Sequence, residues 1–290
     1  MRERTLRASR LDFTALEAGR GPLVLCLHGF PDTRHTYRGL VSDLAKAGYR
    51  AVAPQLRGYE HSSNPRNDDF YLESLAVDVL GWIEDLGEER AHLIGHDWGA
   101  PIAYAASTLA PESVVSVTAM SVPHLRHFRE RIWKHPSQLA RSSYMALFQI
   151  PGVSERIVQS RRLNFLRRLI GRWSPDWTPP EAWLQEILNV FSDRELTKNA
   201  LAYYRCGFDW TDGAGERSLD LARTRTSVPV LSLVGEHDGC MAPGLFETMM
   251  SEDDFSGGLT LREISDAGHF LHLEQPERVT AAILDFIRGL

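Results

Sequence analysis

Short, wholly apolar runs alternate with longer amphipathic runs along most of this 290-residue chain. The apolar runs are typical of strands covered on both faces of a parallel sheet. Many of the amphipathic runs end at glycine or begin at proline, as helices do. The strands expected are 23–27, 50–54, 91–94, 114–119, 228–234 and 259–264, and the helices expected are 36–47, 71–86, 100–109 and 276–287.

This alternation predicts an α/β fold with a mostly parallel, doubly wound sheet. Residues 11–18 are bounded by a Gly- and Pro-containing turn, and we interpret them as an edge strand. Ligands of such sheets bind beyond the carboxyl ends of the strands. His28, Arg57 and Asp97 each follow a strand end. We therefore expect these three side chains to gather at one edge of the sheet.

The strand pattern stops at about residue 123 and returns at about residue 226. Helical patches broken by prolines fill the interval, which predicts a helical lid over 123–225 inserted into a core made of 1–122 and 226–290. The lid carries 17 Lys and Arg against 11 Asp and Glu, whereas the whole chain has a net charge of −6. A basic lid beside an acidic core allows a homodimer.

Candidate chemistry begins at Gly95-His96-Asp97-Trp98-Gly99, which joins an apolar run to a helical one. Strand, tight turn and helix form the setting of a nucleophile elbow, whose apex side chain is exposed for attack. The apex is usually Ser, but here it is Asp97. A carboxylate attacks carbon directly and forms a covalent ester.

Asp238 and His269 follow the last two predicted strands. The order Asp97, Asp238, His269 is the order of nucleophile, acid and base in a hydrolase of this design. An Asp nucleophile is already ionised at neutral pH, so the histidine is reserved for a later step. His269 can activate water, and Asp238 can fix its tautomer.

Four motifs in this order resemble the α/β-hydrolase superfamily over nearly the full chain and, within it, the epoxide hydrolases. They are His28-Gly29-Phe30-Pro31, the elbow, Gly235-Glu236-His237-Asp238 and Gly268-His269-Phe270. The resemblance also implies two lid tyrosines that hold the epoxide oxygen. Tyr144 precedes Phe148-Gln149-Ile150-Pro151-Gly152, and the second lies in Tyr203-Tyr204-Arg205.

Ala202 stands where the family usually has Asn, which leaves Tyr203 and Tyr204 both open as the second tyrosine. Its position directly before Arg205 favours Tyr204. The implied oxyanion hole consists of the backbone N–H groups of Phe30 and Trp98, and Phe30, Pro31 and Trp98 are expected to contact substrate. The implied reaction joins an apolar epoxide and water into a vicinal diol, with no metal and no organic cofactor.

The main alternative is a haloalkane dehalogenase that uses the same Asp97 nucleophile. Trp98 could then donate its indole N–H to a leaving halide, although that family usually has Asn in place of Phe30. A fluoroacetate-type dehalogenase typically carries Arg where this chain has Trp98, and an Arg would bind the substrate carboxylate. A binding protein on a hydrolase scaffold is disfavoured because Asp97, Asp238 and His269 are all present.

Net charge and cysteine content indicate which partners and which cellular compartment to expect. With a net charge of −6, the protein has no overall positive potential that would attract nucleic acid. Cys26, Cys206 and Cys240 lack metal-binding spacing, so we interpret them as free thiols in a reducing compartment. The first residues are charged and no apolar run is long enough to span a bilayer. We therefore expect a cytoplasmic enzyme that acts without a membrane.

Overall fold

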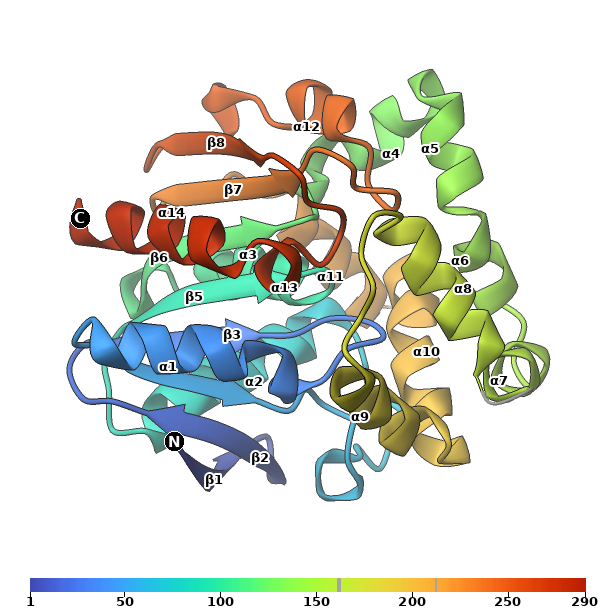
Figure 1. Ribbon diagram of the computed structural model, residues 1–290, viewed down its shortest axis with the longest axis horizontal. Coiled ribbons are helices and arrows are strands. Elements are labelled where there is room, and N and C mark those ends of the chain that lie inside the picture. Colours follow the sequence, from blue (N-terminus) through green and yellow to red (C-terminus); the bar gives the residue numbers. More distant parts are fainter. Residues whose placement is uncertain (161–162, 212) are drawn as a thin grey trace.

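An eight-stranded sheet runs through the middle of the molecule in the computed structural model, which describes residues 1–160, 163–211 and 213–290 (Figure 1). The spatial order is β1-β2-β4-β3-β5-β6-β7-β8. Strands β3 to β8 are parallel, and β2 pairs antiparallel with both β1 and β4. The strands are β1 (Arg2–Ala8), β2 (Leu11–Ala18), β3 (Leu23–Leu27), β4 (Arg50–Pro54), β5 (Ala91–His96), β6 (Val114–Met120), β7 (Val230–Gly235) and β8 (Leu259–Ile264).

Helices cover both faces of the sheet, which confirms the predicted doubly wound architecture. Helices α1 (Arg38–Lys46) and α14 (Pro276–Arg288) pack on one face, and α2 (Leu72–Asp85) and α3 (Gly99–Leu109) pack on the other (Figure 1). All residues of β3 and β5 are buried. The side chains of β3 are wholly apolar, as a strand covered on both faces requires, whereas β5 also buries His92 and His96. The predicted helix at 36–47 begins slightly later, because Arg34–Tyr37 forms a separate 3-10 turn.

The edge-strand interpretation of residues 11–18 is wrong. These residues form β2, which lies inside the sheet because β1 covers its outer side. Sequence reasoning missed β1, since Arg2–Ala8 is mostly charged and only Leu6 and Ala8 are buried. Charged side chains suit a true edge strand, where they oppose pairing with another chain.

The segment between β6 and β7 consists of helices joined by turns and loops in its described residues. It contains α4 (Phe128–Arg131), α5 (Pro136–Arg141), α6 (Ser143–Phe148), α7 (Val153–Gln159), α8 (Asn164–Trp173), α9 (Glu181–Phe191), α10 (Arg194–Phe208) and α11 (Gly213–Arg223). Helices α6, α8, α9 and α10 lie beyond the arrowheads of the parallel strands (Figure 1). The remaining helices, α12 (Pro243–Met249) and α13 (Leu271–Glu274), follow β7 and β8. Within the described residues, no helix is both long and apolar enough to cross a bilayer.

A buried ion pair ties the loop after β4 to α2. The Arg57 guanidinium donates to both carboxylate oxygens of Asp78, at 2.6 and 2.7 Å, and Ser9 donates to the same carboxylate at 2.6 Å. Arg57 does lie at the carboxyl edge of the sheet, but its charge is neutralised by Asp78. Its role is therefore structural.

Removing one partner of this pair should be costly, because the buried guanidinium would lose its two closest carboxylate contacts and keep only the more distant Asp69 carboxylate, at 4.0 Å. We expect Asp78→Ala to lower the free energy of unfolding by about 3–5 kcal/mol. Urea denaturation would measure the loss. Arg7→Ala is the matched control, since the Arg7 pair with Asp12 is largely exposed and should contribute less than about 1 kcal/mol. Equal effects of the two substitutions would contradict this interpretation.

Candidate active site

Asp97 sits at the apex of a sharp turn between β5 and α3. Its φ of 50° lies in the left-handed region, which non-glycine residues rarely adopt. A Cβ at Gly95 would overlap the carbonyl oxygen of Gly99, and a Cβ at Gly99 would overlap the carbonyl oxygen of Leu27. These glycines therefore allow the close backbone approach that turns the Asp97 carboxylate away from the sheet and into a cavity.

The loops after β7 and β8 bring Asp238 and His269 to Asp97. His269 Nδ1 lies 3.0 Å from Asp238 Oδ2, and His269 Nε2 lies 3.5 Å from Asp97 Oδ2. The other oxygen of Asp238 accepts the backbone N–H groups of Cys240 and Met241 at 2.7 and 2.8 Å. The histidine is thus oriented by a carboxylate that is itself fixed by two backbone bonds.

Two carboxylates set the charge of His269. Burial by itself lowers the pKa of the imidazole, but the charge and hydrogen bond of Asp238 and the nearby charge of Asp97 outweigh it and raise the pKa to about 10. The resting imidazole is therefore protonated at neutral pH. Loss of the Asp97 charge would remove one of the two negative charges that raise the pKa of His269, and that pKa would fall.

The His28-Gly29-Phe30-Pro31 loop contacts Asp97 through its backbone. The Phe30 N–H donates to Asp97 Oδ1 at 2.7 Å. A Cβ at Gly29 would come within 2.5 Å of the Asp97 side chain, so this approach needs glycine. The Phe30 ring is fully buried and packs against rings that include Phe148 and Tyr204.

Two tyrosines from the helices between β6 and β7 line the same cavity as Asp97. Tyr144 on α6 and Tyr204 on α10 are buried, and their ring centroids lie 5.8 Å apart. Burial, with the Asp97 charge as a further cause, raises the pKa of both phenols well above the usual value. Both hydroxyls therefore stay protonated. No hydrogen-bond partner for the Tyr204 hydroxyl is found among the described residues.

Tyr203 points elsewhere. Its hydroxyl donates to the Arg57 carbonyl at 2.7 Å, and its ring packs against Tyr59 and Phe70. Of the two tyrosines that the sequence left open, Tyr204 lines the cavity.

Arg205 and Gln149 hold the two tyrosine-bearing helices together. Arg205 donates to the Phe148 carbonyl at 2.9 Å and pairs with Glu155 at 2.8 Å. The Gln149 amide donates to the Tyr204 carbonyl at 3.1 Å. The residues that carried the two lid motifs thus connect α6 to α10 and fix the relative positions of Tyr144 and Tyr204.

The cavity in front of Asp97 has a volume of about 160 Å³ and a mostly apolar lining. Its apolar wall includes Leu72, Trp98, Val122, Phe128 and Trp210. Phe30 and Pro31 are not among its lining residues, because the Phe30 ring is enclosed by other rings and the loop meets Asp97 through the backbone N–H.

Trp173 and Trp183 are not among the residues that line the cavity, and they make other contacts. The Trp173 ring lies 4.9 Å from the His269 ring, and Trp183 Nε1 donates to Asp32 at 2.9 Å. Trp177 packs between Trp183 and Phe270.

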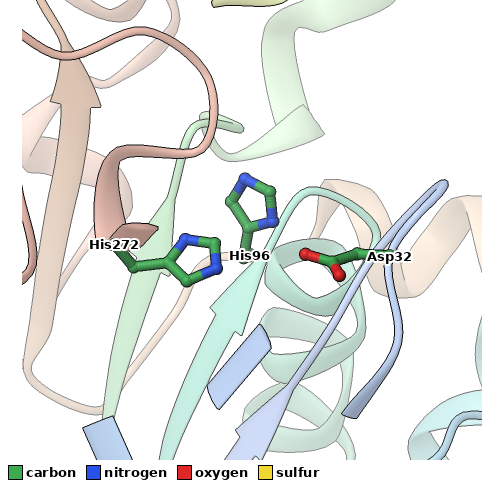
Figure 2. Close-up of side chains that lie close together, drawn as sticks. All are labelled: Asp32, His96 and His272. Carbon is green, nitrogen blue, oxygen red and sulfur yellow. The ribbon is translucent and has the colours of Figure 1, made fainter. Parts of the chain in front are cut away.

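Sequence reasoning missed a buried cluster behind the catalytic loops. Figure 2 shows Asp32, His96 and His272 pointing toward one another, and their potential ligand atoms lie within 4.8 Å of each other. Burial lowers the pKa of His96 to about 3, so its imidazole is neutral, and Nε2 donates to the His269 carbonyl at 2.9 Å. His96 therefore connects the turn at Asp97 to the loop after β8 that carries His269. Two sequence signals could have pointed to this cluster. His96 directly precedes Asp97, and Asp32 directly follows Pro31.

Comparisons with known proteins agree with this geometry. A family model described as the alpha/beta hydrolase fold matches residues 22–276. The chain is 32% identical to epoxide hydrolase A of Mycobacterium tuberculosis over 99% of this chain and 98% of that protein. It is 32% identical to mouse epoxide hydrolase 4 over 98% of this chain and 78% of that protein.

Solved structures show the same likeness. The epoxide hydrolase A structure from Mycobacterium thermoresistibile superposes with a TM-score of 0.81 at 28% identity, covering 100% of this chain and 98% of that one. The Bacillus megaterium epoxide hydrolase, solved with an inhibitor, gives a TM-score of 0.84 at 25% identity, covering 98% of this chain and all of that one. The predicted α/β-hydrolase fold is confirmed.

Proposed function

Because this chain belongs to the epoxide hydrolases of the α/β-hydrolase fold family, we propose that it converts an apolar epoxide and water into a vicinal diol. One observation carries the proposal: two tyrosines whose hydroxyls stay protonated line the same cavity as Asp97. A carboxylate can attack an epoxide carbon, and phenols can donate to the oxygen that leaves that carbon.

In the first step, Asp97 attacks a ring carbon, the carbon–oxygen bond breaks, and the ring oxygen develops negative charge. The Tyr144 and Tyr204 hydroxyls stabilise this charge where it forms. One phenol proton passes to the alkoxide, and the phenolate regains a proton from the imidazolium of His269. The products of this step are a hydroxyalkyl ester on Asp97 and a neutral His269.

In the second step, neutral His269 removes a proton from water, and the oxygen attacks the ester carbonyl of Asp97. Asp238 stabilises the imidazolium that forms. The Phe30 N–H, which lies 2.7 Å from Asp97 Oδ1, is suited to stabilise the ester oxyanion, and the Trp98 N–H is proposed as the second donor. Collapse of the intermediate releases the diol and restores the Asp97 carboxylate.

The cavity supports a substrate with one small apolar substituent. Its volume of about 160 Å³ is close to that of a site that holds a benzene ring, about 150 Å³. Trp98 forms part of the cavity wall. We propose that the loop containing Phe30 and Pro31 acts on the substrate through its backbone. Residues 123–225 are proposed as the lid and 1–122 with 226–290 as the core.

The proposed setting is a reducing, cytoplasmic one. Cys26, Cys206 and Cys240 form no disulfide with one another in the structure described here. A homodimer stays a prediction from the basic lid. The reaction as proposed uses only the side chains and backbone groups named above.

Turnover of styrene oxide and a matched bromoalkane tests the reaction class. The purified protein should form diol from the epoxide and release no bromide from the bromoalkane. Bromide without diol would instead support the dehalogenase alternative and overturn the proposed role of the tyrosines.

We expect Tyr144→Phe and Tyr204→Phe each to lower kcat by about 100- to 1,000-fold, because each removes a donor to the developing alkoxide. Steady-state diol formation measures the loss. Tyr203→Phe is the matched control, since its hydroxyl bonds to the Arg57 carbonyl, and its kcat should stay within about threefold of the unaltered protein. A larger loss in Tyr203→Phe than in Tyr204→Phe would reverse the assignment of the second tyrosine.

A further inference from the structure

Cys240 is a buried thiol that the proposed reaction does not use. It lines the catalytic cavity, and its Sγ lies 3.7 Å from the Tyr144 hydroxyl. Its backbone N–H donates to Asp238 Oδ1 at 2.7 Å. The same carboxylate that orients His269 therefore also fixes the position of this thiol.

The thiol is one of three potential metal ligands at the nucleophile. The ligand atoms of Asp97, Cys240 and His269 all lie within 4.8 Å of one another. His269 is fully buried, and no hydrogen-bond partner of its Nε2 occurs among the described residues. Metal–ligand bonds of about 2.0–2.3 Å place tetrahedral donor atoms about 3.5 Å apart. A shift of about an ångström would bring these three donors onto one ion.

We propose that Asp97, Cys240 and His269 form a binding site for a thiophilic divalent cation, Zn²⁺ or Cd²⁺, inside the catalytic cavity. Thiolate, imidazole and carboxylate are the donors that zinc prefers, and thiolate selects against Mg²⁺ and Ca²⁺. Three protein ligands leave the fourth position to water from the cavity, whose volume of about 160 Å³ accommodates it.

Ligation requires a thiolate from Cys240 and a neutral imidazole from His269, so any proton on either group leaves to solvent when the ion binds.

The second potential ligand cluster, Asp32, His96 and His272, suits a cation less well. The Thr36 hydroxyl already lies 2.7 Å from His272 Nε2. None of the three residues lines the catalytic cavity.

Occupation of the Cys240 site has a functional consequence that rests on the proposed function. An ion bound to Asp97 and His269 Nε2 blocks both the nucleophile and the base. Zn²⁺ and Cd²⁺ should therefore inhibit diol formation reversibly and in competition with the epoxide.

Cd²⁺ titration of the full-length protein tests the site without turnover. In buffer free of chelators and thiol reductants, the unaltered protein should develop the ultraviolet charge-transfer absorption of a cadmium–thiolate bond at one ion per chain. Cys240→Ser should abolish the band and weaken Cd²⁺ binding by about 100-fold or more. Cys206→Ser is the control, because Cys206 also lines the cavity but is not part of the cluster, and it should keep the band.

The outcomes separate the inference from the proposed function. A band that depends on Cys240 supports the site even in a protein that fails to open epoxides. No band, a band that survives Cys240→Ser, or a band lost in Cys206→Ser overturns the site even when diol forms. Inhibition by Cd²⁺ that high epoxide concentrations do not relieve also overturns it.

Discussion

His269→Gln should stop the reaction after its first step and leave one equivalent of epoxide bound to Asp97. The bond to Asp97 forms with the carboxylate and the tyrosine donors, and His269 only returns a proton to the phenolate, a proton that solvent can supply in the variant. Ester hydrolysis, in contrast, needs the imidazole 3.5 Å away. Intact-protein mass spectrometry should show an increase equal to the whole epoxide, and peptide mapping should locate it at residue 97. Steady-state diol formation should fall by about 10,000-fold or more.

The double variant Asp97→Ala/His269→Gln is the control for this adduct. It should gain no mass, because the attacking carboxylate is absent. An adduct that persists in the double variant, or that maps to Cys240, would contradict the assignment of Asp97 as the nucleophile.

The second large effect is expected for Asp97→Ala. Removal of the carboxylate leaves the tyrosines and His269 in place but takes away the group that forms the ester. Diol formation should fall by about 10,000-fold or more and leave no covalent intermediate. The measurement is single-turnover product formation with enzyme in excess.

Stability measurements must accompany Asp97→Ala, because Asp97 accepts the Phe30 N–H and faces His269. If Asp97→Ala unfolds at the same denaturant concentration as the unaltered protein but no longer forms diol, the loss of activity comes from the missing carboxylate and not from unfolding. Full activity in a correctly folded Asp97→Ala protein would eliminate the covalent mechanism.

The proximity of Asp97, Asp238 and His269 could be predicted from the sequence because each one follows a clear boundary. The apolar runs that became β5, β7 and β8 end abruptly, and Asp97, Asp238 and His269 come shortly after them. In a parallel sheet such strand ends share one edge. Chain order and local pattern were therefore enough to bring the three side chains together.

Other features depend on contacts between distant segments, which local pattern does not encode. The charged strand β1 is stabilised by its pairing with β2, and this pairing moves β2 away from the edge. The enclosure of the Phe30 ring depends on packing with Phe148 and Tyr204 from the lid. The approach of Cys240 to Tyr144 likewise depends on how α6 lies over the loop after β7.

The fate of the water oxygen tests the covalent mechanism most directly. In a single turnover in ¹⁸O-water, the proposed mechanism leaves the diol unlabelled, because its new oxygen comes from the Asp97 carboxylate. Water attacks the ester carbonyl, so the peptide that contains Asp97 should gain one ¹⁸O atom. Labelled diol and an unlabelled Asp97 peptide would instead mean that water attacks the epoxide directly, and the ester mechanism would be wrong.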